Sequence, residues 1–578
     1  MRGDYKNMLQ WEECSSSEIE SKPPASLDVV VVNTHVNPDE LDDCSVPAQN
    51  EVYCGRIAAT CALLADASRL LRDGGLLFVY GLPKMLPALA VWLNAHSDEE
   101  CRLLFKYWIA LELKADQSDR SLPHAHLGLL MYLKTKSLRS PTPFALNTKT
   151  VRIPYTNCPA CGEVTKDWGG KKHLINRLGS AVSDVWSVLD THIRDAASIP
   201  QVCLQRIFDL TRHPGSRMLV IRQEALPDYP VPRGSAAGRS VSRPPSRDDV
   251  LHADSLELMR EYARKYPDGL FDLAFADPPY NLAKNYNAYT DQQADADYIA
   301  WCNEWLGLIC EVLRPGGALV VLNIPKWAIY HADFLNFRME FRNWIVWNAL
   351  STPSGKLLPA HYALLYYTKP GGAPTLAYDT VGQIDSREYC LRATCVNRRK
   401  ESGDDRKELL SDVWHDIHRI KHRRDRDPHP CQLPIRLLQR IIELTTRPGD
   451  WVYDPFGGAG TTAIAARISG RRFVISDIDP IYQEIAESNL NRIGELLNGE
   501  KILVRKSVRR SSNGIPRREI EMAYISRCKA MGRVLAIEDL KETDTELYER
   551  IRQHYRDIKY LRKITRRQLE NETLIEHL

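Results

Sequence analysis

The chain has 578 residues, more than one hydrophobic core usually serves, so we expect at least two domains. Its 77 lysine and arginine residues nearly balance 74 aspartate and glutamate residues, and a net charge of +3 excludes a uniformly basic nucleic-acid binder. Fourteen cysteines are too few for a disulfide scaffold, and because the N-terminus is polar and the apolar runs have only strand length, we expect a cytoplasmic protein without membrane spans.

Four segments follow one another along the chain. The first 225 residues contain apolar runs typical of strands, for example at Val29 to Val32. Residues 226–247 are rich in Pro, Ser, Gly and Arg and lack apolar periodicity, which predicts an exposed linker. Solvated arginines are favoured there, and contact of these arginines with phosphate is the alternative. Residues 248–497 return to alternating strand and helix patterns, and we expect residues 498–578 to form a basic, helical tail.

Residues 248–497 carry the clearest pattern of secondary structure. The expected elements are a buried strand at 272–276, a helix at 298–314, a helix at 435–446, a strand at 451–454, a turn at 455–460 and a helix at 461–469. Such an alternation is typical of an α/β fold with a mostly parallel sheet and helices on both faces.

The same motifs recur in both halves of the chain. LDVVVVNTHVN at residues 27–37 corresponds to FDLAFADPPYN at 271–281, and LLRDGGLLFVYGLPK at 70–84 corresponds to VLRPGGALVVLNIPK at 312–326. FKYWI and FRNWI, HLGLLMYLK and HYALLYYTK, two SDVW motifs, and LQRIFDLTRHPG and LQRIIELTTRPG continue the series in the same order. This order predicts a tandem duplication.

The DPPY turn, Asp277 to Tyr280, directly follows the strand expected at 272–276. Ligands of open parallel sheets gather beyond the carboxyl ends of the strands. Asp277 and the carbonyl of Pro278 are two acceptors for the hydrogens of an aromatic amino group, which would orient the nitrogen toward an electrophilic methyl group. Tyr280 would stack on a base flipped out of a duplex. The alternative is a plain Pro-Pro turn after a strand.

A glycine-rich turn, DPFGGAGTT at residues 454–462, connects the expected strand at 451–454 to the following helix. Glycines there let a ligand approach the backbone closely, and GRRFVISDIDP places Asp477 at the end of the next strand, where it would bind the hydroxyls of a ribose. A dinucleotide would also suit such a turn, whereas the absence of a Gly-Lys-Ser/Thr ending disfavours a phosphate-binding loop.

With these motifs, residues 248–495 resemble the beta-class DNA amino-methyltransferases of bacteria and their phages. The shared order is ADSLEL, DPPY, LRPGGALVVLNIPK, a variable stretch at about 370–427, HPCQLP, DPFGGAGTT and SDIDP. The resemblance implies a Rossmann-like, seven-stranded methyltransferase fold, S-adenosylmethionine as cofactor and DNA recognition by the variable stretch. The base-holding residues that it implies are Asp277, Pro278, Pro279 and Tyr280. Its cofactor-binding residues are Asp254, Asp277, Asp454, Phe456, Gly457, Gly458, Gly460, Thr461 and Asp477.

The aspartate at the head of DPPY is similar to the adenine-N6 enzymes of this family, whereas cytosine-N4 members more often carry serine there. We therefore expect a DNA adenine-N6 methyltransferase. The alternatives are a cytosine-N4 enzyme, an RNA methyltransferase, and a DNA-binding subunit of a larger modification complex. One departure is Leu433, which stands where the family's HPxQKP motif has lysine, and it puts one cofactor contact in doubt.

The first copy has lost both motifs. NTHVN, residues 33–37, stands in place of DPPYN, and the linker follows where a glycine loop would be. We expect this copy to be catalytically inactive and to serve as a built-in partner, forming an internal pseudo-dimer with the second copy. Contact with DNA and a purely structural role are both open for it, as are further oligomerisation and a restriction or defence-system partner.

CPACG, at residues 158–162, is half of a zinc knuckle, and the second copy has cysteines at the equivalent place. One hypothesis is therefore a structural zinc ion bound by Cys158, Cys161, Cys390 and Cys395. The alternative is a relict knuckle with free, buried thiols, because the second pair is spaced more loosely and lacks the glycine turn.

Basic residues gather between the two motif groups, where the resembled family reads DNA. These predicted DNA contacts are Arg398, Arg399, Lys421, His422, Arg423 and Arg424. In the tail, an apolar stripe predicts one long helix, for which packing on the core is favoured over contact with a partner or DNA. The stripe consists of Leu547, Ile551, Ile558, Leu561 and Leu569.

Overall fold

The computed structural model separates the chain into two compact units, residues 1–494 and 495–578. The residues that it describes are 11–96, 102–115, 122–137, 141–165, 176–224, 248–285, 290–349, 356–390, 392–404, 406–417, 433–491, 493, 517–531, 533–554, 561–562 and 565. The predicted linker at 226–247 lies outside the described residues. No described helix is long and apolar enough to cross a membrane.

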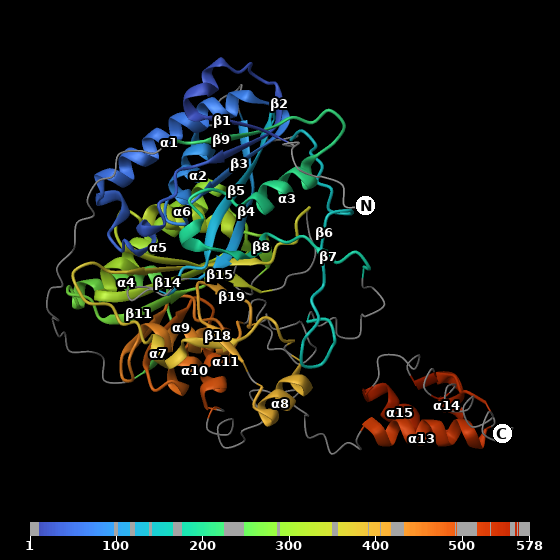
Figure 1. Cartoon of the computed structure of the whole chain (residues 1–578). Helices are drawn as coiled ribbons and strands as arrows, with labels where there is room; N and C mark the ends of the chain where they lie inside the picture. Colours follow the sequence, from blue (N-terminus) through green and yellow to red (C-terminus); the bar gives the residue numbers. More distant parts are fainter. Residues whose placement is uncertain are drawn as a thin grey trace. The chain divides into compact units, whose positions relative to one another are not determined.

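An eight-stranded mixed sheet forms the centre of the second half of the larger unit (Figure 1). Its order is β10 (Asp249–His252), β21 (Arg472–Asp477), β20 (Trp451–Asp454), β11 (Phe271–Ala276), β14 (Leu313–Asn323), β16 (His361–Thr368), β15 (Glu340–Asn348) and β19 (Val413–Trp414). Only β16 runs antiparallel to its two neighbours. The expected α/β class is thus confirmed, but the sheet has eight strands rather than seven because β19 adds to β15.

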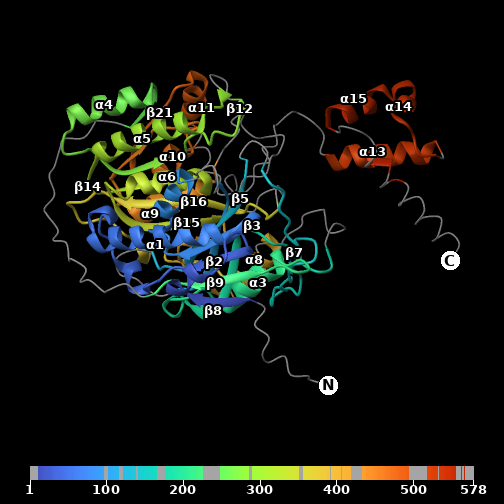
Figure 2. The ribbon, with the colours of Figure 1, turned by 90° about the horizontal axis from the view of Figure 1, so that it is seen from above.

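Helices cover both faces of this sheet, as expected. On one face lie α4 (Ser255–Lys265), α5 (Asp295–Val312) and α6 (Pro325–Leu335), and on the other α9 (Ile435–Thr445), α10 (Thr461–Ile468) and α11 (Pro480–Asn491). Figure 2 shows α4 and α5 side by side. Alternation along β11 explains the two layers, since Ala274 and Ala276 join the first core while Leu273 and Phe275 join the second.

The first half forms a seven-stranded sheet. Its order is β1 (Glu12–Ser15), β9 (Met218–Arg222), β2 (Leu27–Asn33), β3 (Leu71–Gly81), β5 (His126–Thr135), β4 (Arg102–Lys114) and β8 (Val185–His192). The run from β9 to β8 follows the same order and directions as the run from β20 to β19. At the outer edge, β1 from the start of the chain pairs with β9, in the place that β21 takes beside β20.

The two halves share one hydrophobic core. On the first sheet, α1 (Glu51–Leu70) and α2 (Leu86–Ala95) cover the face toward the second half, and α3 (Gln201–Thr211) covers the other face. Helices α2 and α6 pack against each other. Trp108 of β4 stacks on Trp344 of β15, with ring centroids 3.8 Å apart and planes at 8°. These two tryptophans occupy the same position of the repeated motif FKYWI/FRNWI.

Short elements complete the structure. In the larger unit they are β6 (Arg152–Ile153), β7 (Ser180–Ala181), β12 (Lys284–Asn285), β13 (Thr290–Asp291), α7 (Tyr378–Val381), β17 (Gln383–Asp385), α8 (Ala393–Ser402) and β18 (Lys407–Leu409). The smaller unit contains α13 (Arg517–Ala530), α14 (Ile537–Thr543) and α15 (Thr545–His554), which pack around a core of their own that includes Tyr524, Leu540 and Ile551. The predicted stripe residues Leu547 and Leu561 belong to this core, whereas Ile558 and Leu569 lie outside the described residues.

Candidate active site

The DPPY turn and the glycine-rich turn leave neighbouring parallel strands at the same edge of the sheet. Strands β11 and β20 are paired with Ala274 opposite Tyr453. Asp277 and Phe456 each lie three residues beyond that paired position, so both turns begin side by side at the carboxyl ends of their strands. The sequence predicted this edge as the place for ligands.

Hydrogen bonds from two helices hold the backbone of the DPPY turn. The hydroxyl of Tyr298, on α5, donates to the carbonyl of Pro279 at 2.6 Å, and Trp327 Nε1, on α6, donates to the carbonyl of Tyr280 at 2.7 Å. Among the described hydrogen bonds none uses the Pro278 carbonyl. The half-buried Asp277 accepts a 2.6 Å hydrogen bond from the Tyr280 hydroxyl through Oδ1, so the aromatic ring is held beside the carboxylate.

The chain after Tyr280 turns sharply. Asn281 has φ of 52°, in the left-handed region that asparagine tolerates better than most residues, and its backbone N–H donates to Asp291 Oδ1 at 2.7 Å. The N–H of Leu282 donates to the other oxygen of the same carboxylate at 3.1 Å. Asp291 is a positioning residue that the sequence reasoning missed, because a ten-residue separation leaves no local signal.

A buried carboxylate organises the glycine-rich turn. Asp454, at the end of β20, accepts hydrogen bonds from the N–H of Phe456 at 2.9 Å and from the hydroxyl of Thr462 at 2.5 Å. Burial raises the pKa of Asp454 to about 7 despite these donors. The predicted cofactor residue Asp454 thus shapes the loop, and Thr461, the half-buried first residue of α10, follows it.

Close packing explains why the turn needs glycine. Gly460 has φ of 81°, and a Cβ there would lie 2.8 Å from Cβ of Ala486 on α11. A Cβ at Gly457 would lie 3.0 Å from Cβ of Ile475 on β21. Both distances are shorter than ordinary carbon contacts, so the loop lies directly on β21 and α11.

Asp477 lies at the end of β21, beside this loop. Its Oδ2 accepts from the N–H of Gly458 at 2.9 Å and its Oδ1 accepts from the N–H of Asp479 at 2.9 Å. Burial raises the pKa of this carboxyl above its ordinary value, although the N–H groups of Asp479 and Gly458 act in the opposite direction. A carboxylate held by neutral donors suits further neutral donors such as sugar hydroxyls.

Asp254 follows β10, which is paired with β21, and the N–H of Ala253 donates to the carbonyl of Asp477 at 3.0 Å. The exposed Asp254 carboxylate caps α4 by accepting from the N–H groups of Leu256 and Glu257 at 2.8 and 3.2 Å. The four acids predicted for the cofactor site thus lie at the ends of four adjacent strands. Asp454 and Asp477 end β20 and β21, whereas Asp254 and Asp277 follow β10 and β11.

A series of aromatic rings joins the two turns and was not predicted. Phe456 packs against Trp305 and Trp301, with ring centroids 5.3 and 5.8 Å apart. Trp301 contacts Tyr298 at 5.9 Å, and Tyr298 contacts Trp327 at 4.7 Å, which brings the series to the DPPY backbone. The sequence predicted the helix that carries Tyr298, Trp301 and Trp305, but not which ring contacts Phe456.

The equivalent place in the first half has a different structure. The carboxamide oxygen of Asn33 accepts from the N–H of Ile199 at 3.1 Å, and the hydroxyl of Thr34 donates to the carbonyl of Tyr80 at 2.7 Å. Val36, which stands where Tyr280 stands in the second half, is 1% exposed and belongs to the core. The described residues after β9 reach Glu224 without a glycine-rich turn.

The four predicted metal ligands come together. One ligand atom from each of Cys158, Cys161, Cys390 and Cys395 lies within 4.8 Å of all the others. By contrast, the DNA contact expected of Arg399 is a wrong prediction. This side chain is 1% exposed, and its Nη1 donates to the carbonyl of Cys390 at 3.2 Å and to the sulfur of Cys395 at 3.4 Å.

One further predicted DNA contact, Arg398, lies among the described residues. Arg398 donates from Nη2 to the carbonyl of Ala160 at 2.5 Å. The remaining four residues of this group, Lys421, His422, Arg423 and Arg424, lie outside the described residues.

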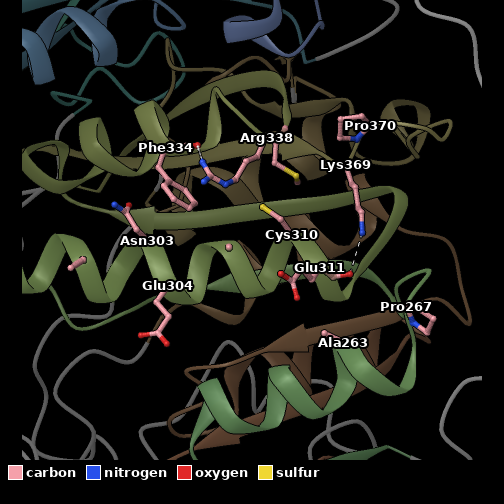
Figure 3. A pocket seen from close by; sticks show the side chains of 13 residues that line it. Ala263, Pro267, Asn303, Glu304, Cys310, Glu311, Phe334, Arg338, Lys369 and Pro370 are labelled. Carbon is pink, nitrogen blue, oxygen red and sulfur yellow. Dashed lines mark hydrogen bonds between the residues drawn. The ribbon is translucent and has the colours of Figure 1, made fainter.

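A broad hollow of about 1050 Å³ lies between α4, α5 and the end of α6, away from both turns (Figure 3). Lys369 donates from Nζ to the carbonyl of Glu311 at 3.1 Å, and Arg338 donates from Nη1 to the carbonyl of Phe334 at 3.1 Å. Neither the DPPY residues nor the glycine-rich turn lines this hollow. Its two basic side chains are bound to backbone carbonyls and Glu304 is paired with Arg260, so the hollow offers no evident chemistry.

Comparison with known proteins identifies relatives of the second half. A sequence model of the DNA methylase family matches residues 271–488. The type II methyltransferase M.BamHI of Bacillus amyloliquefaciens is 36% identical over 229 residues, which cover 39% of this chain and 53% of that protein, so the match spans about half of the relative. The DNA adenine methyltransferase YhdJ of Escherichia coli (strain K12) is 30% identical over 253 residues, which cover 40% of this chain and 79% of YhdJ.

Among solved structures, this chain is similar to the putative DNA modification methylase TTHA0409 of Thermus thermophilus, complexed with S-adenosyl-L-methionine. The match covers 42% of this chain and 93% of the TTHA0409 chain. The two share 21% sequence identity with a TM-score of 0.30.

Proposed function

This chain belongs to the DNA methylase family, and we propose that it transfers a methyl group from S-adenosylmethionine to the N6 amino group of an adenine in DNA. The observation that carries the proposal is the placement of Asp277 and Phe456 side by side, three residues beyond paired positions of β11 and β20. A base-holding turn and a cofactor-holding turn at one edge bring the two reactants together.

The DPPY turn would hold the base. Asp277 and the carbonyl of Pro278 accept the two hydrogens of the amino group, which turns the nitrogen lone pair toward the methyl group. Tyr280 stacks on the flipped base and returns part of the free energy of unstacking. Because the Tyr280 hydroxyl donates to Asp277 without substrate, entry of the base exchanges that hydrogen bond for one from the amino group.

The residues around the glycine-rich turn fit the cofactor. The backbone at Gly457 and Gly458 allows close approach, and Phe456 offers an aromatic face. Asp477 offers a carboxylate that accepts from the backbone N–H groups of Gly458 and Asp479. When bound, S-adenosylmethionine supplies an electrophilic methyl group. Asp254, one strand further along the edge, would lie near the adenine moiety of the cofactor.

The first half would act as a catalytically inactive copy of the second, and the two would form an internal pseudo-dimer. Reciprocal contacts support this. Asp184 Oδ1 accepts from the N–H of Ala360 at 2.8 Å, and Asp412 Oδ1, at the same position of the repeated SDVW motif, accepts from the N–H of Ala125 at 2.8 Å. In an isologous interface each residue makes such a contact with the other copy.

A methyl-transfer assay with labelled cofactor tests the function. Duplex DNA, single-stranded DNA and RNA of the same sequence are offered, and the products are separated as nucleosides. We expect N6-methyladenine from DNA, and we expect Asp277→Ala to lower the rate by about 100-fold or more because the amino group is no longer oriented. Asp297→Ala, an exposed acid on α5, is the control that keeps full activity. Labelled RNA but not DNA would contradict the proposal, and N4-methylcytosine would correct the base.

A further inference from the structure

Four cysteine side chains from the two halves of the chain meet at one point. Cys158 and Cys161 lie on a turn closed by hydrogen bonds from the N–H of Gly162 to the carbonyl of Cys158 and from the N–H of Cys158 to the carbonyl of Glu163, both 2.8 Å. Cys390 lies just before α8, and Cys395 lies in the first turn of that helix. Cys158 is fully buried, and Cys390 and Cys395 are buried with it.

The separations of the sulfur atoms match a tetrahedral metal site. The sulfur atoms of Cys158 and Cys395 are 3.8 Å apart, and those of Cys161 and Cys390 are 3.7 Å apart. Four thiolates at zinc–sulfur distances of about 2.3 Å in a tetrahedron have sulfur atoms about 3.8 Å apart. A disulfide would need about 2.05 Å, so neither pair is bonded. Both measured pairs also cross from one half of the chain to the other.

Arginine side chains of α8 bind the cysteine turn of the first half. Arg398 donates to the carbonyl of Ala160 at 2.5 Å, and Arg392, just before the helix, donates to the carbonyl of Val164 at 2.7 Å. The buried Arg399 donates to the sulfur of Cys395 at 3.4 Å. Four thiolates around one Zn²⁺ carry a net charge of −2, which a guanidinium at this distance partly offsets.

We propose that Cys158, Cys161, Cys390 and Cys395 bind one structural Zn²⁺ that joins the two halves of the chain. The coordination is closed by four protein ligands, so the ion takes no part in chemistry. It fixes the segment from β17 to β18, in the stretch between the two motif groups, against the first half. The proposal does not depend on the proposed function, because metal content is measured without any assay of methyl transfer.

The first test is metal analysis of the full chain, purified without chelator from cells grown with added zinc. We expect about one equivalent of zinc per chain, as four thiolates bind this ion tightly. Replacement by Co²⁺ should give the intense visible absorption of a tetrahedral site and a near-ultraviolet thiolate-to-cobalt band. Less than about half an equivalent of zinc, without the cobalt spectrum, would overturn the proposal.

The second test compares two cysteine variants. Cys161→Ser removes the ligand that is least buried, and we expect its zinc content and its cobalt absorption to fall at least several-fold. Cys54→Ser, at an exposed position on α1, should keep both. Full zinc occupancy in Cys161→Ser would contradict the assignment. If that variant does not fold, the cobalt spectrum of the unaltered chain tests the assignment instead. The intensity of the thiolate-to-cobalt band grows with the number of thiolate ligands, so it distinguishes four cysteine ligands from two.

Discussion

Tyr280 illustrates how one residue combines two separable contributions at the proposed site. Its ring is placed to stack on a flipped base, and its hydroxyl donates to Asp277 in the absence of a base. Base–aromatic stacking contributes about 1–3 kcal/mol, which corresponds to about a 5- to 150-fold change in rate or affinity.

We therefore expect Tyr280→Ala to lower kcat/KM for methyl transfer by about 10- to 100-fold, and Tyr280→Phe to stay within a few-fold of the unaltered chain. Steady-state kinetics on a duplex oligonucleotide check this, and calorimetry should find cofactor affinity unchanged in both variants. Equal loss in both variants would instead assign the role to the hydroxyl.

The motifs of the proposed site could be predicted from the sequence, whereas the residues that support them could not. DPPY and the glycine-rich turn are contiguous motifs, so their placement at strand ends followed from local pattern. Tyr298 and Trp327 hold the DPPY carbonyls from two other helices, and such long-range hydrogen bonds leave no local signal. Arg399 was misassigned for the same reason, since a basic residue on a short helix is usually exposed, and only the fold shows that it is buried beside Cys395.

At the scale of elements, the connection from β20 to α10 leaves no room for a larger residue at Gly460. Gly460→Ala would bring Cβ to 2.8 Å from Ala486 and would also force alanine into the left-handed region. We expect cofactor affinity to fall by about 10-fold or more and stability to fall by about 1–3 kcal/mol. Calorimetric titration and urea unfolding measure the two effects.

Gly470→Ala is the matched control for this variant. Gly470 has φ of 72°, but a Cβ there meets nothing within 4 Å. It therefore carries the conformational strain without the close contact, and cofactor binding should be retained. A similar loss of affinity in both variants would show that strain alone, rather than closeness of the loop to α11, governs the site.

Element boundaries were predicted well where apolar periodicity is strong. The strand at 451–454 is confirmed as β20, and the predicted helix at 298–314 lies at Asp295–Val312, because residues from Leu313 onward already belong to β14. The edge strands β1 and β19 were missed. They have four and two residues, and such short segments acquire strand structure only by pairing with a neighbour.

At the scale of the whole molecule, the interface between the halves contains two tryptophans from the same position of the repeated motif. Trp108 and Trp344 are fully buried and stack at 3.8 Å. We expect either tryptophan-to-alanine variant to lose about 3–5 kcal/mol of stability, and a double-mutant cycle to give a coupling of about 0.5–1.5 kcal/mol. Urea unfolding measures all four proteins, and strictly additive losses would argue against a direct energetic link between the halves.

The equivalent acids Asp184 and Asp412 should differ in their response to pH. Burial raises the pKa of Asp184 to about 7, whereas Asp412, although burial opposes its ionisation, has a pKa of about 2 because His126 and His124 lie beside it. An aspartate in the unfolded chain has a pKa of about 3.9. The folded state thus binds the Asp184 proton more tightly, and this acid's contribution to stability falls as pH rises from about 4 to about 7.

We expect Asp184→Asn to gain stability relative to the unaltered chain as pH rises from 5 to 8. Asp412→Asn should lose stability at both values, because the low-pKa carboxylate stabilises the fold above about pH 4 and loses this effect only as pH falls through about 2. Unfolding free energies at the two pH values test this, and a pH dependence that Asp184→Asn leaves unchanged would contradict it.

The most direct test of the account is single-nucleotide mapping of methylated bases in genomic DNA from a methylation-free host that expresses the chain. The control is a host that expresses Asp277→Ala. We expect N6-methyladenine at one short sequence, lost in the control, and marking of one strand alone would support a pseudo-dimer with one active copy. Genomic DNA without any methylated amino group, from cells that contain folded protein able to bind S-adenosylmethionine, would contradict the account.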